Sequence, residues 1–418
     1  MRIPFNTPAR RGPIVVAAAL LAVAYVTIAA GQFAASWFGG RVELKSLKRA
    51  AWLDPGNADY RNHLGRYYDL VARDPNAAVQ EYRAAAQLNP HSARYWFDLA
   101  SSYQVLGDTA NQAAALENAI KADATTPDVA WEAANLYLVQ GENEKALREF
   151  RVVIANDPSL ADVALQFAWR IHPDVDSMLR DLVPVRADAY TSFLELLESK
   201  QETSGAQKVW DALMQTHQPF ELPHAYDYIH YLVQHKEVDA AVQAWQQIAS
   251  RFGLSSYLPS FSNLIVNNNF NLKVLNAGFD WQHQKQSGVT LTLDSSDFHA
   301  GRRSLLITFD GPGIVESGIY QLIAVQPNTT YDFSGYYKTG EFEGAGGPHF
   351  TIQDMYTQAV YYESEELRDM GFWKSADGEF TTAPDCKLIV LHVRRLPAGS
   401  PMRGKLWIGD FHLTRRPS

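Results

Sequence analysis

Cysteine is almost absent from this sequence, because the 418 residues include only Cys386. One thiol cannot form a disulfide within the chain, and it cannot supply the several thiolates of a cysteine-based metal site. The fold must therefore be stabilised by burial of apolar side chains. A chain of this length is too long for one ordinary core, so two or three domains are expected.

The sequence has fewer basic than acidic residues. It contains 37 Lys and Arg residues and 46 Asp and Glu residues, which gives a net charge of −9. Nucleic-acid binding depends on clustered positive charge that contacts phosphates. The composition therefore argues against nucleic acid as the main ligand.

Recognisable catalytic motifs are missing. No glycine-rich loop ends in Gly-Lys-Ser or Gly-Lys-Thr, and neither Gly-x-Ser-x-Gly nor His-Glu-x-x-His occurs. Carboxylates are plentiful, but nothing selects the opposed pair that a glycosidase needs. Four histidines recur at spacings of 7, 6 and 5, which do not place two imidazoles one helical turn apart: His217, His224, His230 and His235. The sequence thus predicts a protein that is not an enzyme and has no organic cofactor.

One long apolar run lies near the N-terminus. Residues 14–38 are almost entirely apolar or small, and about 20 such residues are enough for a helix to cross a bilayer. The alternative is a cleaved signal peptide, since Ala29-Ala30-Gly31 offers small residues for processing. Because the run is longer than a usual signal core, we expect a retained transmembrane anchor within residues 1–40.

Charges on the two sides of this run predict its orientation. Arg2, Arg10 and Arg11 precede it and favour a cytoplasmic N-terminus. The basic residues between Arg41 and Arg49 follow it and oppose that assignment. We expect a single-pass protein of a bacterial-type inner membrane, with the N-terminus inside and the rest of the chain extracytoplasmic.

A pattern then repeats between residues 54 and 170. Asp54, Asn89, Asp123 and Asp157 lie 35, 34 and 34 residues apart. A small residue followed by tyrosine three positions later recurs after the first three of these, as Gly65 and Tyr68, Ala100 and Tyr103, and Ala134 and Tyr137. Such self-similarity indicates stacked helix pairs that touch through small residues.

At these positions the chain resembles the tetratricopeptide repeat (TPR) family. The resemblance implies an α-solenoid with a concave groove that binds a protein partner. Carried over from the family, the groove candidates are Asn62, Arg66, Phe97, Trp131, Asn135 and Trp169. The alternative is that the aromatic rings among them are buried by the superhelix itself. Helical spacing continues in weaker register through residues 171–253, so the helical domain is expected over residues 41–253.

From residue 254 the pattern changes to short alternating runs broken by Gly, Pro, Asn and Asp, which indicate an antiparallel β-sandwich over residues 254–418. Strands are expected at 290–293, 304–309, 318–323, 330–338, 349–354, 371–373, 378–382, 387–394 and 406–413. The predicted fold class is therefore a multidomain chain: a transmembrane helix, an α-solenoid and an antiparallel β-sandwich, for which the resemblance described next implies the jelly-roll type.

Short motifs in this region resemble carbohydrate-binding modules of the galactose-binding-like, jelly-roll type. They include Asn263 to Phe270, Gly278-Phe279-Asp280-Trp281, His299 to Leu305 and Trp407 to Phe411. In that family an acidic residue after the opening phenylalanine and an aspartate in the last strand hold a structural calcium ion. Here Asn271 replaces the first and Asp410 retains the second, so the resemblance implies a calcium site of reduced strength at Asp410.

Strand alternation predicts which side chains of the sandwich turn away from its core. One open face is expected to share Tyr336, Gln353, His392 and Arg394, with Lys338 beside Tyr336 and with Tyr361 or Trp373 on the rim. These residues are the glycan-binding candidates. The alternative is a polar face that is merely solvated.

The sequence therefore predicts a membrane-anchored scaffold that binds a protein through its repeats and a glycan through its sandwich, in the assembly or export of an envelope polysaccharide. The alternative is an assembly factor that binds proteins only. A weaker alternative is an accessory domain that serves a neighbouring glycosyl enzyme.

Overall fold

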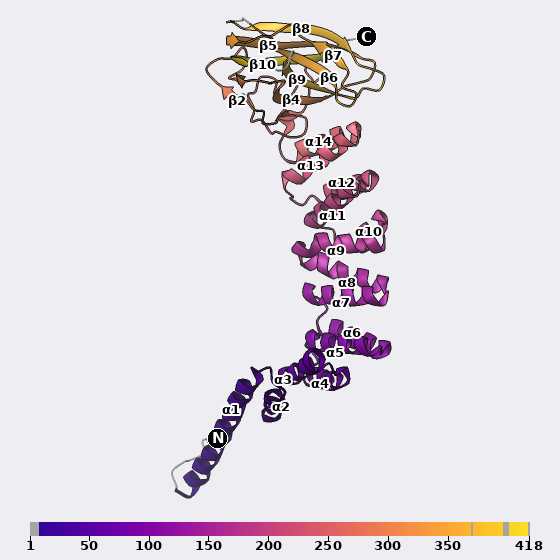
Figure 1. Cartoon of the computed structure of the whole chain (residues 1–418), viewed down its shortest axis with the longest axis vertical. Coiled ribbons are helices and arrows are strands. Elements are labelled where there is room, and N and C mark those ends of the chain that lie inside the picture. Colours follow the sequence, from indigo (N-terminus) through magenta and orange to yellow (C-terminus); the bar gives the residue numbers. More distant parts are fainter. Residues whose placement is uncertain (1–7, 369–370, 396–400, 417–418) are drawn as a thin grey trace. The chain divides into compact units, whose positions relative to one another are not determined.

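The computed structural model describes residues 8–368, 371–395 and 401–416, and the chain divides into two compact units at Leu196 and Leu197. The first unit is helical, and the second holds further helices followed by strands (Figure 1). The helices are α1 (Pro8–Gly39), α2 (Leu44–Leu53), α3 (Ala58–Arg66), η1 (Tyr67–Ala72), α4 (Pro75–Leu88), α5 (Ala93–Leu106), α6 (Thr109–Ala122), α7 (Pro127–Gln140), α8 (Asn143–Asn156), α9 (Pro158–Ile171), α10 (Val175–Asp181), α11 (Ala187–Ser199), α12 (Thr203–Thr216), α13 (Leu222–Gln234), α14 (Val238–Arg251) and η2 (Ser255–Tyr257).

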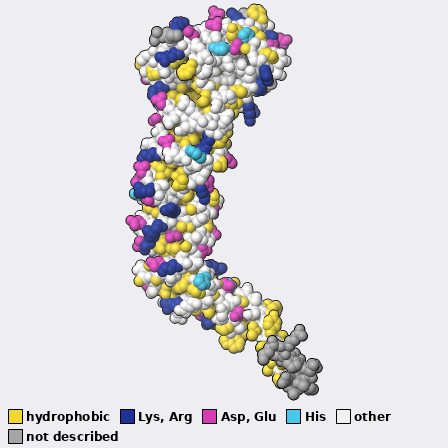
Figure 2. All heavy atoms as spheres, turned by 180° about the vertical axis from the view of Figure 1, so that it is seen from behind, with side chains coloured by type: hydrophobic (Ala, Val, Ile, Leu, Met, Phe, Trp, Pro, Cys, Tyr) yellow, Lys and Arg dark blue, Asp and Glu magenta, His cyan; other side chains and the backbone are white. Residues whose placement is uncertain are grey.

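The apolar N-terminal run forms the long helix α1. Within it, Gly12–Gly39 is long and apolar enough to cross a membrane, a property shared by signal sequences. Figure 2 shows hydrophobic side chains gathered over the described part of this helix. Arg2 lies outside the described residues.

The 34-residue pattern is confirmed as a series of helix pairs, in which α3 packs on α4, α5 on α6 and α7 on α8. The recurring Asp54, Asn89, Asp123 and Asp157 each stand directly after the second helix of a pair. Asp157 also caps the next helix, because its Oδ1 accepts a hydrogen bond of 2.9 Å from the Ser159 N–H. Asp157 therefore ends one helix and starts the next, whereas the helices after Asp54, Asn89 and Asp123 begin three residues later, at the N-cap residues Asn57, Ser92 and Thr126.

Small residues bring neighbouring helices into direct contact. Ala100, Ala134 and Ala168 are fully buried. Gly65 occupies the equivalent place on α3, where an added Cβ would lie 2.5 Å from Cδ1 of the buried Tyr82. The backbone of α3 can therefore approach the ring of Tyr82 only because residue 65 has no side chain.

The first repeat departs from a regular α-helix. Its first helix continues beyond Arg66 as the π-helical turn η1, which ends at Arg73 in the left-handed region with φ of 53°. Leu70 and Val71 in this turn are exposed. Single π-helical turns occur frequently at functional sites.

The weaker helical spacing after residue 170 is confirmed as α10 to α14. In the second unit α14 packs against the start of the sandwich, because Trp245 Nε1 donates a hydrogen bond of 3.1 Å to the Tyr257 carbonyl. The domain boundary expected at residues 253 and 254 lies between α14 and η2. The division into compact units falls earlier, inside α11.

The C-terminal region is an antiparallel sandwich of two five-stranded sheets. The first sheet has the order β1-β4-β9-β6-β7 and the second has the order β2-β3-β10-β5-β8. The strands are β1 (Trp281–His283), β2 (Val289–Asp294), β3 (Ser304–Gly311), β4 (Glu316–Ala324), β5 (Thr330–Glu343), β6 (Pro348–Asp354), β7 (Val360–Glu363), β8 (Lys374–Thr381), β9 (Leu388–Arg395) and β10 (Met402–Arg415).

Aromatic and aliphatic side chains from both sheets fill the space between them, including Phe270, Trp281, Phe350 and Phe411. The strand expected at residues 371–373 is wrong, since β8 begins only at Lys374. The short strands β1 and β7 were not predicted, because three or four residues show too little alternation to be recognised.

One prediction concerns the contact between Gly65 and Tyr82. Gly65→Ala should lower the free energy of unfolding by about 1–3 kcal/mol, because overpacking outweighs the gain of up to about 1 kcal/mol in helix propensity. Thermal unfolding of the full chain in detergent, followed by circular dichroism, measures the effect. Gly56→Ala is the control, since a Cβ there meets nothing within 4 Å. Equal stability of the two variants would contradict the packing argument.

A second prediction concerns Asp280, a fully buried carboxylate before β1. Burial raises the pKa of Asp280 to about 6, although its Oδ2 accepts a hydrogen bond of 2.7 Å from the Leu275 N–H. The folded state therefore binds this proton more tightly than the unfolded state, in which the pKa is about 3.9. The stabilisation is complete below about pH 4 and is lost as the pH rises through about 6.

Denaturant unfolding of the wild type should therefore show a loss of about 2 kcal/mol between these pH values that Asp280→Asn does not show. Asp385→Asn, at an exposed position, should follow the wild type. A parallel pH dependence of all three proteins would refute the assignment to Asp280.

Candidate functional site

The side chains predicted to share one glycan-binding face lie on two different sheets. Gln353 is on β6, and His392 and Arg394 are on β9, all in the first sheet. Tyr336 and Lys338 are on β5 in the second sheet. The predicted common face is therefore wrong. Alternation along a strand tells which side chains leave the core, but it does not tell which sheet the strand joins.

On the outer face of the first sheet, β4, β9 and β6 bring four polar side chains together. Arg394 is paired in register with Glu316 on β4 and with His349 on β6. Arg394 Nε lies 2.7 Å from Glu316 Oε1, an ion pair by distance although it is not aligned as a hydrogen bond. Arg394 Nη1 donates to Gln353 Oε1 at 3.2 Å, and His392 Nδ1 lies 3.3 Å from Glu316 Oε2. We call Glu316, Gln353, His392 and Arg394 the polar network.

Two further side chains extend this face towards β1. Tyr320 is paired in register with His392, and its hydroxyl donates a hydrogen bond of 3.0 Å to Gln282 Oε1. Glu316, Tyr320 and Gln282 were not predicted. The alternation of Tyr320 with the buried Ile319 and Ile323 is the signal that would have identified Tyr320, whereas a register shift separates Glu316 from it and Gln282 belongs to the short β1.

The network keeps part of its hydrogen-bonding capacity. Glu316 and Arg394 have side chains about one-third exposed, at 33% and 28%. The described contacts of Arg394 use Nε and Nη1, whereas a guanidinium has five N–H donors. Beneath them, among the described residues, His392 Nε2 and Thr351 Oγ1 are buried without a hydrogen-bond partner. Polar groups on this face are thus incompletely satisfied.

The outer face of the second sheet also carries polar groups that contact one another, and the side chains of Lys338 and Asp297 are 25% and 28% exposed. Asp297 accepts hydrogen bonds from Lys338 Nζ at 2.5 Å and from Trp373 Nε1 at 3.0 Å. The imidazole of His299 is stacked on Tyr336, with ring centroids 3.7 Å apart. Tyr336, Lys338 and Trp373 therefore do lie together, but one ring face of Tyr336 is already covered.

Tyr361 does not lie on the outer face of either sheet. It is packed against the sandwich core and stacks on Phe380, with ring centroids 6.0 Å apart. Its hydroxyl accepts a hydrogen bond from the Ala383 N–H at 3.2 Å. Burial raises the pKa of Tyr361, and the adjacent Cys386 adds to the shift. The location of Tyr361 fits a structural role better than the expected place on a rim.

The surroundings of Asp410 do not fit a calcium ion. Its two carboxylate oxygens contact imidazole nitrogens, with His299 Nδ1 at 2.8 Å from Oδ2 and His412 Nε2 at 3.0 Å from Oδ1. Calcium binds six to eight oxygen ligands. Within the described residues, no group of three or more His, Cys, Asp or Glu side chains is arranged to hold a metal.

In the repeat domain, Asn62 and Arg66 meet at Asp98. Asn62 Nδ2 donates a hydrogen bond of 2.7 Å to Asp98 Oδ2, and Arg66 Nε lies 3.6 Å from the same oxygen. Burial raises the pKa of Asp69, and the negative charge of Asp98 adds to the shift. In the part of the chain that the structure describes, Asn62 Oδ1 is buried without a partner.

The aromatic candidates of the groove are not equivalent. Phe97 is buried at 2% exposure, so for this ring the alternative of burial by the superhelix itself holds. Trp131 is half-buried and packs edge-on against Phe150 and Phe167, with centroids 5.8 Å apart in both cases. Trp169 is also half-buried, and Asn135 donates from Nδ2 to the Trp131 carbonyl at 2.8 Å. Partner binding by Trp131, Asn135 and Trp169 stays a prediction.

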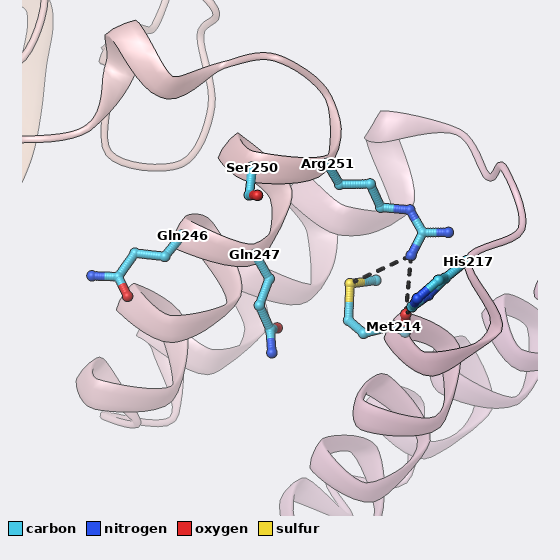
Figure 3. A pocket seen from close by; sticks show the side chains of 6 residues that line it. All are labelled: Met214, His217, Gln246, Gln247, Ser250 and Arg251. Carbon is cyan, nitrogen blue, oxygen red and sulfur yellow. Dashed lines mark hydrogen bonds between the residues drawn. The ribbon is translucent and has the colours of Figure 1, made fainter.

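An open pocket of about 540 Å³ lies between α12 and α14. Figure 3 shows the side chains that line it, which are Met214, His217, Gln246, Gln247, Ser250 and Arg251. Arg251 donates to the Met214 carbonyl at 3.3 Å and also to the Gln218 carbonyl. The only strong cation of the cavity lining therefore joins the two helices. This arrangement fits a structural role for Arg251.

Comparison with known proteins covers both parts of the chain. Residues 262–395 match the family model described as a carbohydrate binding domain. No curated protein matches the chain. The solved structure described as "CBM4 structure and function" is 16% identical, covers 36% of this chain and 99% of its own, and has a TM-score of 0.29.

Two further solved structures are also similar to part of the chain. MamA is 20% identical and covers 41% of this chain and 85% of its own, with a TM-score of 0.23. PilF from Pseudomonas aeruginosa is 15% identical and covers 50% of this chain and 82% of its own, with a TM-score of 0.23. Residues 262–395 are thus similar to a carbohydrate binding domain, and the helices before them form pairs at the 34-residue spacing of the sequence pattern.

Proposed function

We propose that this protein is a non-catalytic scaffold that is anchored in a membrane, binds a glycan through the polar network of its first sheet, and binds a protein partner through its repeats. The observation that carries the glycan proposal is the polar network, which lies within a domain that matches a carbohydrate-binding family. Carbohydrate-binding modules and TPR-like repeats are non-catalytic kinds of domain, which supports the first part of the proposal.

The chemistry of the network suits sugar hydroxyls. A hydroxyl is both a donor and an acceptor, and it can therefore bridge the N–H groups of Arg394 and the carboxylate of Glu316. Tyr320, paired in register with His392, supplies an aromatic ring on the same face. Charge-assisted hydrogen bonds of this kind are about twice as strong as neutral ones.

Packing at the end of α1 supports a retained anchor. Ala35 is fully buried, and an added Cβ at Gly39 would lie 2.4 Å from Cε1 of Tyr60 on α3. The last turns of α1 are thus part of the repeat fold. We infer an anchor in a bacterial-type inner membrane with the N-terminus inside and a role in the assembly or export of envelope polysaccharide.

The alternative function is an assembly factor that binds only proteins. On the second sheet, Asp297, Lys338 and Trp373 bind one another, and His299 stacks on Tyr336. Such contacts can serve the fold alone, which favours this alternative for that face. The two functions differ in whether the polar network binds polysaccharide.

Substitution at the network tests the glycan proposal. Arg394→Gln should weaken binding to envelope polysaccharide by roughly 10- to 100-fold, because a hydrogen bond to a charged group contributes about 1.5–3 kcal/mol. Affinity electrophoresis of the full chain in detergent through gels that contain bacterial polysaccharides measures the change, after a glycan array has identified a binding sugar.

Lys338→Gln on the second sheet is the matched control and should leave binding unchanged. Loss of binding with Lys338→Gln alone would move the site to the second sheet. Failure of the wild type to bind any polysaccharide would favour the protein-only alternative.

The protein partner is tested by photo-crosslinking in living cells. A photoreactive amino acid at Asn135, on the predicted groove side of α7, should give a discrete crosslinked protein. The same group at Arg148, which is exposed on α8, the second helix of the pair, should not. Equal crosslinking from both positions would contradict a specific groove on α7.

A further inference from the structure

A cleft lies between the end of α1 and the first repeat. It has a volume of about 350 Å³ and is lined by Gly39, Gly40, Arg41, Val42, Leu47, His63, Arg66, Tyr67, Leu70 and Val71. Most of this lining is apolar, and two guanidinium groups belong to it. The π-helical turn η1 supplies Leu70 and Val71, so the irregular part of the first repeat forms one wall.

The apolar residues at the mouth of the cleft are unusually exposed for a folded domain. Val42 is 78% exposed, Leu70 is 73% exposed and Val71 is 56% exposed. Trp52 at the end of α2 is 78% exposed. Exposed apolar residues that cluster in this way mark a contact with a protein, a ligand or a membrane.

Cationic side chains surround the same end of α1. The guanidinium of Arg41 lies 3.7 Å from the ring centroid of Trp37, and that of Arg49 lies 5.5 Å from the ring centroid of Phe38. Lys45 and Lys48 add two further charges, whereas Glu43 is the only acid between residues 41 and 53. Aromatic rings beside cations are typical of the membrane interface, and cations there attract anionic headgroups.

The position of the cleft relative to α1 is fixed by packing. Ala35 is buried, and the close approach of Gly39 to Tyr60 leaves no room for a side chain between α1 and α3. Four residues connect α1 to α2. If α1 spans the bilayer, as the proposed function requires, the cleft lies at the level of the lipid headgroups.

We propose that this cleft binds one anionic phospholipid. The lipid phosphate contacts Arg41, and the upper part of an acyl chain lies against Val42, Leu70 and Val71. Arg66, which is also close to Asp98, lines the same cleft and adds positive charge. A zwitterionic lipid fits less well, because its ammonium group would face the cationic end of α2.

The experiment uses the full chain, purified in a neutral detergent and supplied with dioleoyl phosphatidylglycerol or dioleoyl phosphatidylcholine. Native mass spectrometry should show one retained phosphatidylglycerol molecule and weaker retention of phosphatidylcholine. Thermal unfolding should occur at a higher temperature with phosphatidylglycerol than without it. Equal retention of the two lipids would overturn the proposal.

Substitutions locate the lipid. Arg41→Gln and Leu70→Ser should each reduce retention of phosphatidylglycerol by roughly tenfold, the effect of losing one charged hydrogen bond or one buried apolar side chain. Lys121→Gln and Val105→Ser are the matched controls, at exposed positions on α6 and α5, and should leave retention unchanged. Equal effects of the cleft and control variants would also overturn the proposal.

The intact mass of the protein, read together with its lipid selectivity, separates this proposal from the proposed function on which it rests. The intact mass of protein extracted from membranes shows whether α1 is retained. Cleavage after Ala30 would refute the anchor, whereas a retained α1 without lipid selectivity would refute only the lipid site. A dimer that excludes phosphatidylglycerol would show that a second copy covers the cleft.

Discussion

Close contact between a small residue and a large one is the constraint on which the helical part depends. Gly65 against Tyr82 and Gly39 against Tyr60 bring backbone directly against an aromatic ring, and Ala100, Ala134 and Ala168 occupy equivalent buried positions along the repeats. Because the two glycine contacts leave no space for a methyl group, the sequence determines how closely the helices approach there. The contact of Gly39 with Tyr60 joins the end of α1 to the first repeat. It therefore places the cleft of the first repeat beside the proposed membrane surface.

The sandwich uses a different constraint, the alternation of side chains along a strand. Phe350, Ile352, Leu391 and Val393 point into the core, and the residues between them must therefore face outward. On β9 these outward residues are His392 and Arg394, which meet Glu316 of β4 and Gln353 of β6. A polar network that is partly exposed at Glu316, Gln353 and Arg394 and buried at His392 thus lies on an apolar layer, and this arrangement holds its side chains in place.

The sequence was sufficient for element types and insufficient for the arrangement of strands. The helix pairs, the weaker helices α10 to α14 and most strands follow from local periodicity, which is visible along the chain. Pairing between distant strands is not visible there, so Tyr336 and Arg394 were assigned to one face although β5 and β9 belong to different sheets. Phe97 shows the same limit, because its burial depends on neighbouring helices and not on its position within one repeat.

The remaining hydrogen-bonding capacity distinguishes the two outer faces of the sandwich. On the second sheet, both oxygens of Asp297 and both oxygens of Asp410 contact protein groups, so a ligand would have to displace existing partners. On the first sheet, Glu316 and Arg394 remain about one-third exposed, and the described contacts of Arg394 use only part of its guanidinium. Both oxygens of Glu316 also contact protein groups, so the capacity for additional hydrogen bonds lies in the guanidinium of Arg394. Since an exchange of equivalent hydrogen bonds gives little net free energy, the first sheet is the face on which glycan binding would be favourable.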